Sequence, residues 1–337
     1  MPTSLSNKTA CPVTVPPKAG RFAIIITMGD PSGIGPEVTL KSLASPKVSG
    51  LADFLVIGDK SLIDRESARL GLRRRFPIMD LANVPRRNFS FGIAHPSFGR
   101  ASLEYINEAL RLLKKGKAGA LVTSPVSKRS IELSGLPGFT GHTEYLASRT
   151  RTKDYAMMFV GKNLKVVLVT RHIALKDVPA ALSMKSIYKT IIITDKYLKS
   201  FFKIRRPRIG VAGLNPHSSE GGLLGVEEKT KIIPAIRNAS RYVKFIYGPI
   251  PPDVIFHEAL NGKYDAVIAM YHDQGLIPFK MLYFNSGVNL TLGLPFVRTS
   301  PDHGTAFDIA GKGMADPRSM MEAILLAHRL SMRNVGA

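Results

Sequence analysis

Residues 264–275 read YDAVIAMYHDQG, a short apolar run that ends abruptly on a histidine and an aspartate. The run from Ala266 to Met270 has the length of a buried strand. Two further stretches repeat the pattern, because VVLVTRH (166–172) and IGVAGLNPH (209–217) also place a histidine just past an apolar run. Short apolar runs that alternate with helical stretches indicate βαβ units. The sequence therefore predicts an α/β protein with a mixed, mostly parallel sheet.

The same alternation extends over most of the chain. Strands are expected at 22–28, 53–59, 120–126, 157–160, 166–170, 209–214, 243–248, 266–270 and 289–293. Helices are expected from about Pro36 and at 62–70, 101–115, 184–202, 226–240, 253–261 and 317–330. The 337 residues exceed the usual size of a single core, so we expect two domains. The first would comprise 21–135 and 300–337 and the second 136–299, with the active site in the cleft between them.

The composition is that of a globular protein, with 45% hydrophobic and 21% charged residues. No apolar stretch approaches the ~20 residues that cross a bilayer, which predicts no membrane association. The first twenty residues lack the apolar core of a signal peptide and are expected to form a mobile tail. Cys11 is the only cysteine, so no intrachain disulfide can form. A reducing cytoplasm is the expected location, and any metal must have nitrogen and oxygen ligands.

The net charge of +22 comes from 47 basic and 25 acidic side chains. Two interpretations compete, because such a chain can bind a polyanion or can simply attract anionic small molecules. The basic clusters are LRRRF (72–76), PRR (85–87), KKGK (114–117), RTRTK (149–153) and KIRRPR (203–208). They are dispersed and lack the spacing of a known nucleic-acid motif, which disfavours specific nucleic-acid binding.

The three histidines that follow apolar runs are His172, His217 and His272. In open α/β sheets, ligands bind beyond the carboxyl ends of the strands, where these histidines are expected to lie. Asp273 follows His272 directly and is a suitable acceptor for a ring N–H. Any one such histidine alone is more often a hydrogen-bonded structural residue. Three neutral imidazoles together suit Zn²⁺ or a similar ion, although their spacing alone does not show that they meet.

Two glycine-rich stretches are further candidates. MGDPSGIGPEV (28–38) lacks the G-x-G-x-x-G pattern, and it is either a strand–helix turn or a close approach to a ligand. DHGTAFDIAGKG (302–313) is either an ordinary connection or a nucleotide loop. In the second case Asp308 would accept ribose hydroxyls and favour NAD over NADP. His142, within GFTGHTEY, suits a substrate-contacting loop.

These stretches together resemble the 4-hydroxythreonine-4-phosphate dehydrogenase family of vitamin B6 biosynthesis. The resemblance extends from about Phe22 to Leu330, and its long motifs occur in the family's order. They include ITMGDPSGIGPEV, LVTSPVSK, GFTGHTEYLA, LNPHSSEGG, AMYHDQGLIPFK and GVNLTLGLPFVRTSPDHGTAFDIAGKG. The family is related in fold to the isocitrate and isopropylmalate dehydrogenases. The resemblance therefore implies a two-domain α/β/α architecture of that type.

The resemblance also implies a set of site residues and partners. The implied metal ligands are His172, His217 and His272. The implied substrate contacts are His142, Thr143, Lys280, Asn289 and Arg298, and the implied cofactor loop contains His303, Gly304, Thr305 and Asp308. The implied cofactors are NAD and a divalent metal, with Zn²⁺ favoured by three imidazoles and Mg²⁺, Mn²⁺ or Co²⁺ as alternatives. The active form would be a homodimer with shared active sites.

The implied reaction is the oxidation of 4-phosphohydroxy-L-threonine, a phosphorylated amino acid. The product, a 2-amino-3-oxo acid, would decarboxylate to 3-amino-2-oxopropyl phosphate in pyridoxal phosphate biosynthesis. Lys280 and Asp273 are candidate catalytic residues, and the general base is Asp273, Lys280 or a metal-bound hydroxide. One rival is a dehydrogenase of 4-phosphothreonate or 4-phosphoerythronate. Another is a polyanion-binding protein on an inactive dehydrogenase scaffold, against which the intact histidine set argues.

Overall fold

A computed structural model describes residues 22–87 and 89–333, so the expected tail at 1–20 lies outside the described residues. The strands are β1 (Phe22–Thr27), β2 (Phe54–Gly58), β3 (Ile78–Asp80), β4 (Ala118–Thr123), β5 (Ala156–Val160), β6 (Lys165–Leu168), β7 (Ile209–Ala212), β8 (Ile246–Ile250), β9 (Ala266–Ala269), β10 (Val288–Leu292) and β11 (Val297–Pro301). Within the described residues they form one sheet in the order β3-β2-β1-β4-β11-β10-β5-β6-β9-β7-β8. Seven of its ten pairings are parallel, which confirms the predicted class.

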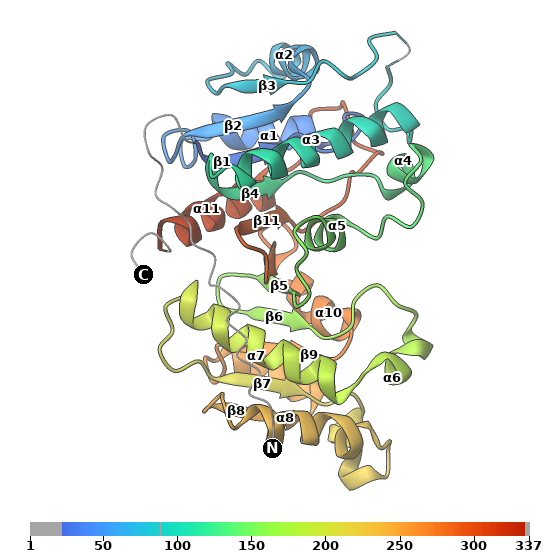
Figure 1. The fold of residues 1–337 in the computed structure, drawn as a ribbon, viewed down its shortest axis with the longest axis vertical. Helices are drawn as coiled ribbons and strands as arrows, with labels where there is room; N and C mark the ends of the chain where they lie inside the picture. The colour runs from blue at the N-terminus through green and yellow to red at the C-terminus, as the bar shows by residue number, and fades with distance from the viewer. Residues whose placement is uncertain (1–21, 88, 334–337) are drawn as a thin grey trace.

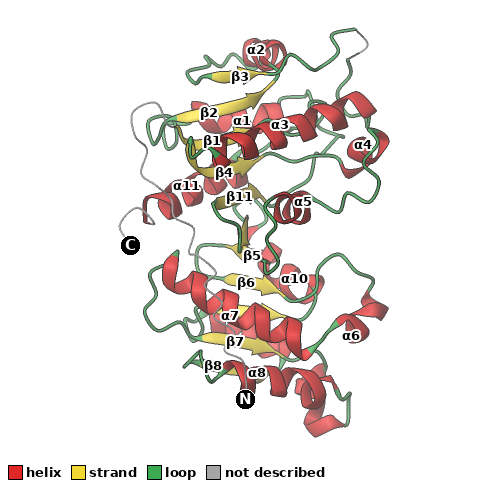
Figure 2. Cartoon of the chain, viewed as in Figure 1, coloured by secondary structure: helices red, strands yellow, loops and turns green. Residues whose placement is uncertain are grey.

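Helices cover both faces of this sheet. They are α1 (Gly35–Ala44), α2 (Lys60–Arg69), α3 (Pro96–Lys114), α4 (Lys128–Leu133), α5 (His142–Arg149), α6 (Val178–Ala181), α7 (Met184–Ser200), α8 (Ile233–Ala239), α9 (Pro252–Leu260), α10 (His272–Tyr283) and α11 (Arg318–Arg333). Figure 1 shows α3 and α7 in front of the sheet and α11 and α10 behind it. Figure 2 shows the strands as one continuous central layer. Among the described helices, none has the length and hydropathy of a membrane-crossing segment.

The central strands are apolar at consecutive positions because both faces of the sheet are covered. Val167 and Ile268 join the main core cluster. Their neighbours Val166 and Val267 belong to a second cluster, on the face that α9 and α10 cover. All four side chains are fully buried. This two-sided burial explains why β6 and β9 appear as unbroken apolar runs rather than as alternating patterns.

The strand direction reverses in the middle of the sheet. The pairings β11–β10, β10–β5 and β5–β6 are antiparallel, whereas the strands on either side pair in parallel. One row of partners therefore crosses the sheet through Leu121, Arg298, Thr291, Met157, Leu168 and Ala269. His172 and His272 follow the last two members of this row by only a few residues. The topology thus places these histidines in the same region as Arg298.

The division into two domains stays a prediction. Its first part would contain β1–β4 and its second part β5–β10, and the proposed boundary at 299/300 falls inside β11. Most expected elements are present, with altered limits. The helix expected from residue 101 begins at Pro96, because the His95 side chain accepts the Ser97 N–H and Pro96 fits the first helical position. The strand expected at 243–248 lies at Ile246–Ile250.

Candidate active site

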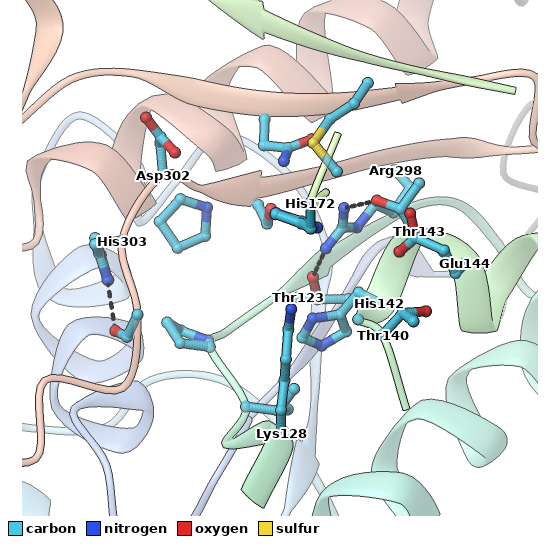
Figure 3. Close-up of a pocket in the computed structure, with 18 of the residues that line it drawn as sticks. Thr123, Lys128, Thr140, His142, Thr143, Glu144, His172, Arg298, Asp302 and His303 are labelled. Carbon is cyan, nitrogen blue, oxygen red and sulfur yellow. Dashed lines mark hydrogen bonds between the residues drawn. The ribbon is translucent and has the colours of Figure 1, made fainter. Parts of the chain in front are cut away.

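A cavity of about 340 Å³ opens beside β4, β10 and β11, and helices α4, α5 and α10 border it (Figure 3). Eight of the thirteen predicted site residues line it, namely His142, Thr143, His172, Lys280, Asn289, Arg298, His303 and Gly304. The five that do not line it are Asp273, Thr305, Asp308, His217 and His272. The residues that the sequence scatters over more than 160 positions are thus largely brought to one place.

Arg298 is the electrostatic centre of the cavity. It extends from β11, is only 2% exposed, and donates hydrogen bonds to the hydroxyls of Thr123 (2.6 Å), Thr291 (3.1 Å) and Thr143 (3.4 Å). Its Nε is buried without a partner, and no carboxylate among the described residues lies within ion-pair distance of it. Burial lowers the pKa of Arg298 to about 9, so the guanidinium is still charged at neutral pH. The more distant Glu144 carboxylate opposes this effect but does not pair with the guanidinium. A buried cation without a directly paired carboxylate is suited to an anionic ligand.

The N-terminus of α5 faces the same cavity. His142 is its first residue, so the expectation that His142 lies in a loop is wrong; Gly141, at φ 150°, occupies the N-cap position and brings no capping side chain. The first N–H that bonds within the helix is that of Tyr145, to Gly141, which leaves the preceding N–H groups for a ligand. His142 Nε2 is buried and unpartnered. Burial lowers the pKa of His142 well below its usual value, and the positive charge of Arg298 lowers it further, so the ring is neutral.

Lys280 lies opposite, on α10. Its Nζ donates to the carbonyl of Asp302 (3.1 Å) and lies 3.4 Å from Asp302 Oδ2. Burial raises the pKa of Asp302, although the nearby Lys280 ammonium opposes this effect. Asn289, on β10, contributes a buried side-chain oxygen that has no partner among the described residues. This wall of the cavity therefore offers one charged donor and one free acceptor to a ligand.

Two of the three strand-end histidines lie side by side. The ring centroids of His172 and His272 are 5.6 Å apart. His272 begins α10, and its Nδ1 lies 2.6 Å from Asp273 Oδ1. Asp273 thus holds the orientation of the ring and leaves Nε2 for a ligand. Within residues 22–87 and 89–333 no three His, Cys, Asp or Glu side chains are grouped as a metal site, so His217 does not join the pair.

The segment that carries His217 is held from both sides. Buried Glu228 accepts the N–H groups of Leu214 and Asn215, each at 2.8 Å. Gln274 bridges two strand ends, because its side chain accepts the Met270 N–H and donates to the Gly213 carbonyl. Beyond these anchors, residues 217–220 all adopt positive φ angles between 44° and 69°. His217 is exposed at the tip of this left-handed turn.

The predicted cofactor loop, residues 302–313, packs against the β1–α1 turn. A Cβ at Gly33 would lie 3.0 Å from the Thr305 side chain and carbonyl, so glycine allows this close approach. His303 Nε2 is buried and unpartnered, Gly304 borders open space, and Asp308 is exposed. Buried Glu37 accepts the N–H groups of Gly313 (3.2 Å) and Ala315 (2.8 Å) and so anchors the far end of the loop. The arrangement leaves an open rim with free polar atoms, which fits a nucleotide cofactor.

Several lining residues were not singled out from the sequence. They are Thr123, Lys128, Thr140, Glu144, Ser300 and Asp302. Thr123 and Lys128 lie within the LVTSPVSK motif, and Glu144 and Asp302 adjoin predicted site residues, so proximity to a motif was the available signal. Glu144 lies 3.2 Å from Arg171. Nothing in the local pattern of these residues distinguishes them from ordinary polar positions.

Comparison with known proteins identifies the relatives of this chain. The family model described as pyridoxal phosphate biosynthetic protein PdxA matches residues 44–327. A 4-hydroxythreonine-4-phosphate dehydrogenase of Desulforapulum autotrophicum is 45% identical over 323 residues, which cover 91% of this chain and 95% of the relative. A D-threonate 4-phosphate dehydrogenase of Salmonella typhimurium is 41% identical over 326 residues, which cover 91% and 98%.

A solved structure agrees with these matches. The crystal structure of 4-hydroxythreonine-4-phosphate dehydrogenase from Klebsiella pneumoniae superposes with a TM-score of 0.83 at 38% identity. The match covers 92% of this chain and 99% of the solved one. The sequence relatives and the structural neighbour therefore indicate the same family over almost the whole length.

Proposed function

This chain belongs to the pyridoxal phosphate biosynthetic protein PdxA family, and we propose on that basis that it oxidises 4-phosphohydroxy-L-threonine with NAD. The product is a 2-amino-3-oxo acid, which loses carbon dioxide to give 3-amino-2-oxopropyl phosphate. The observation that carries the proposal is the buried, carboxylate-free guanidinium of Arg298 beside the open N-terminus of α5. A phosphoryl group supplies the anion that this arrangement lacks.

Each wall of the cavity has a separate role in the proposal. Arg298, Thr143 and neutral His142 hold the phosphoryl group, and the Asn289 oxygen accepts a hydrogen bond from the amine or a hydroxyl. Lys280 lines the cavity, whereas Asp273 bonds to His272 and does not. We therefore assign proton transfer to Lys280 and the orientation of the His272 ring to Asp273. These contacts align the reacting C–H and exclude alternative poses.

NAD, when bound, accepts the hydride. His303, Gly304, Thr305 and Asp308 would hold it, and the open space at Gly304 together with the exposed Asp308 carboxylate supports this assignment. A carboxylate at that position favours the 2′-hydroxyl of NAD over the 2′-phosphate of NADP.

A divalent cation fits the histidines only in part. His172 and His272 lie close enough to share an ion, whereas His217 does not reach them within one described chain. Zn²⁺ is the ion that imidazole ligands favour, with Mg²⁺, Mn²⁺ and Co²⁺ as alternatives. The shell would then be completed across a subunit boundary, by a second copy of the chain.

An exposed apolar stripe on α10 supports a homodimer. Ile277, Met281 and Phe284 are 60%, 82% and 70% exposed, and their spacing places them along one side of the helix. Such a stripe is unusual on a solvated helix and is typical of a contact surface. Lys280, which lines the cavity, directly precedes Met281 on the same helix, so a partner that covers the stripe would lie next to the site. The single cysteine fits a reducing cytoplasm, which is the location we propose.

The relatives also support a second substrate, because the relative from Salmonella typhimurium, at 41% identity, is named a D-threonate 4-phosphate dehydrogenase. The two substrates differ in whether C2 carries an amine or a hydroxyl. The deciding experiment measures NADH formation with each substrate on chelated protein and on protein restored with a divalent ion. Turnover of 4-phosphohydroxy-L-threonine with the higher kcat/KM supports the proposal, and a preference for D-threonate 4-phosphate replaces it with the second candidate. Equal turnover by metal-free protein would remove the cation from the account.

A further inference from the structure

The charged side chains around the cavity do not balance. Five line it, namely Lys128, Glu144, Lys280, Arg298 and Asp302. Two of the five are neutralised locally, because Asp302 lies 3.4 Å from Lys280 and so pairs with it. Glu144 pairs with Arg171, which lies outside the cavity, at 3.2 Å, although its charge also acts on Arg298 from beyond ion-pair distance. The two lining charges that remain without a close ion pair are cations, Lys128 and Arg298.

Lys128 is directed at this unbalanced region. It is the first residue of α4, and the buried Ser127 side chain caps the helix by accepting the Ser130 N–H. Figure 3 shows the Lys128 ammonium beside His142 and directed toward the Arg298 guanidinium. A Cβ at Gly141 would lie 3.9 Å from Lys128 Cε, so the side chain passes close to the N-terminus of α5. Among the described residues, no carboxylate lies within ion-pair distance of Lys128.

Two cations that face one cavity repel each other unless an anion lies between them. A phosphate monoester carries a charge of about −1.5 to −2 at neutral pH, which matches the two unpaired positive charges. Arg298 is fixed by its threonine hydrogen bonds, whereas Lys128 is solvent-exposed and can move onto a ligand. A buried, hydrogen-bonded cation and an exposed one therefore line the same cavity.

We propose that Lys128 is the second phosphoryl-binding cation of the site and closes over the phosphate opposite Arg298. This inference rests on the proposed function only in taking the ligand's anion to be a phosphoryl group. Lys128 thereby sets the preference for phosphorylated over unphosphorylated substrates. Its role is in binding, and it takes no part in the hydride or proton transfer.

The test compares Lys128→Met with Arg129→Met, in which a neighbouring exposed cation that does not line the cavity is removed. Loss of one charge-assisted contact is expected to raise the dissociation constant for inorganic phosphate, measured by titration calorimetry, by about 10- to 100-fold. The KM for 4-phosphohydroxy-L-threonine should rise by a similar factor with little change in kcat. The kcat/KM for unphosphorylated 4-hydroxy-L-threonine should stay the same, and Lys128→Arg should recover most of the lost affinity.

A structural role for Lys128 predicts a different result, because both substrates would then lose activity together. The inference is overturned if Lys128→Met binds phosphate as tightly as Arg129→Met, or if turnover of the unphosphorylated substrate falls equally. Phosphate binding is measured without turnover, so it separates this inference from the proposed function. Should wild-type protein oxidise neither phosphorylated acid but still bind phosphate in a Lys128-dependent way, the proposed function fails and the anion site stands.

Discussion

Arg298→Met is expected to weaken substrate binding and at the same time to stabilise the fold. Burial lowers the pKa of Arg298 from 12.5 to about 9. A lowered pKa for a basic group means that the folded state disfavours its charged form. At about 1.4 kcal/mol per pKa unit, this amounts to roughly 5 kcal/mol of destabilisation at every pH below about 9. Methionine is unbranched and apolar, although shorter, and removes this penalty.

Part of this increase in stability is offset, because the Thr123 hydroxyl loses the guanidinium that donates a hydrogen bond to it at 2.6 Å. Leaving such a group unsatisfied costs about 1–3 kcal/mol. The expected net increase in the free energy of unfolding is about 2–4 kcal/mol, in line with other replacements of buried charges by apolar side chains. The KM for the phosphorylated substrate should rise about 100-fold or more, because at least two charge-assisted hydrogen bonds are lost.

Urea denaturation without ligand and initial-rate kinetics would measure the two effects. Arg208→Met is the matched control, because Arg208 pairs with Asp265 at the surface and should change stability by less than about 1 kcal/mol. Added inorganic phosphate should stabilise wild-type protein and the control but not Arg298→Met. A variant that is less stable than wild type without ligand, or one that keeps its KM, would refute the account of Arg298 as an unpaired cation that awaits an anion.

Three further outcomes are expected. Glu37→Gln should raise the KM for NAD about tenfold, equivalent to about 1.4 kcal/mol, because Glu37 anchors the predicted cofactor loop at Ala315. The KM for the phosphorylated substrate should stay within about twofold of the wild-type value. An unchanged KM for NAD would contradict this role of Glu37. Met281→Glu should convert the proposed dimer to monomers, measured by light scattering, and should abolish turnover. Tyr242→Glu, which changes a side chain 72% exposed elsewhere on the surface, should do neither. A dimeric Met281→Glu protein would exclude the α10 stripe as the dimer contact. Burial raises the pKa of Asp30 from 3.8 to about 6, so its carboxylate destabilises the fold above pH 6 and this penalty disappears as the pH falls below about 4. Asp30→Asn should therefore be more stable than wild type by up to about 3 kcal/mol at pH 7 and equal to it near pH 4, by denaturation at both values.

The sequence predicted those parts of the fold in which burial is continuous. Strand β9 and, after Lys165, strand β6 are apolar at every position because both faces are covered, and their limits were placed within two residues. Strand β11 was not expected, because FVRTSP contains a charged residue and a proline at positions that are fully buried. We attribute this exception to the proposed anion site, in which Arg298 is buried to bind a ligand. Helix α10 was also not predicted, since it follows β9 almost directly and contains Pro278.

The sequence could predict the position of a site residue where that residue directly follows a strand. It could not predict the position where tertiary contacts determine it. His172 and His272 follow strands that pair through the β6–β9 register, so their proximity is a consequence of topology. His217 follows a comparable strand, but the left-handed turn at 217–220 takes it away from that position. Four consecutive non-glycine residues in this conformation have no signal in the sequence. Lys128 looks like a solvated charge until α4 and α5 are brought together.

The placement of the anion site and the histidines has a consequence for catalysis. The proposed phosphoryl-binding groups belong to α4, α5 and β11, whereas the histidine pair follows β6 and β9. The reversal of strand direction brings His172 into the same cavity, with His272 beside it. A substrate must therefore span from Arg298 to His172 and His272, with its phosphate remote from the reacting carbon. Binding energy from a remote group can be used to align the reacting bond, so an unphosphorylated analogue should lose kcat as well as affinity. Lys128→Met keeps Arg298 and the α5 N-terminus and thus keeps this alignment, so this substitution should raise KM alone. Arg298→Met, in contrast, should raise KM and lower kcat.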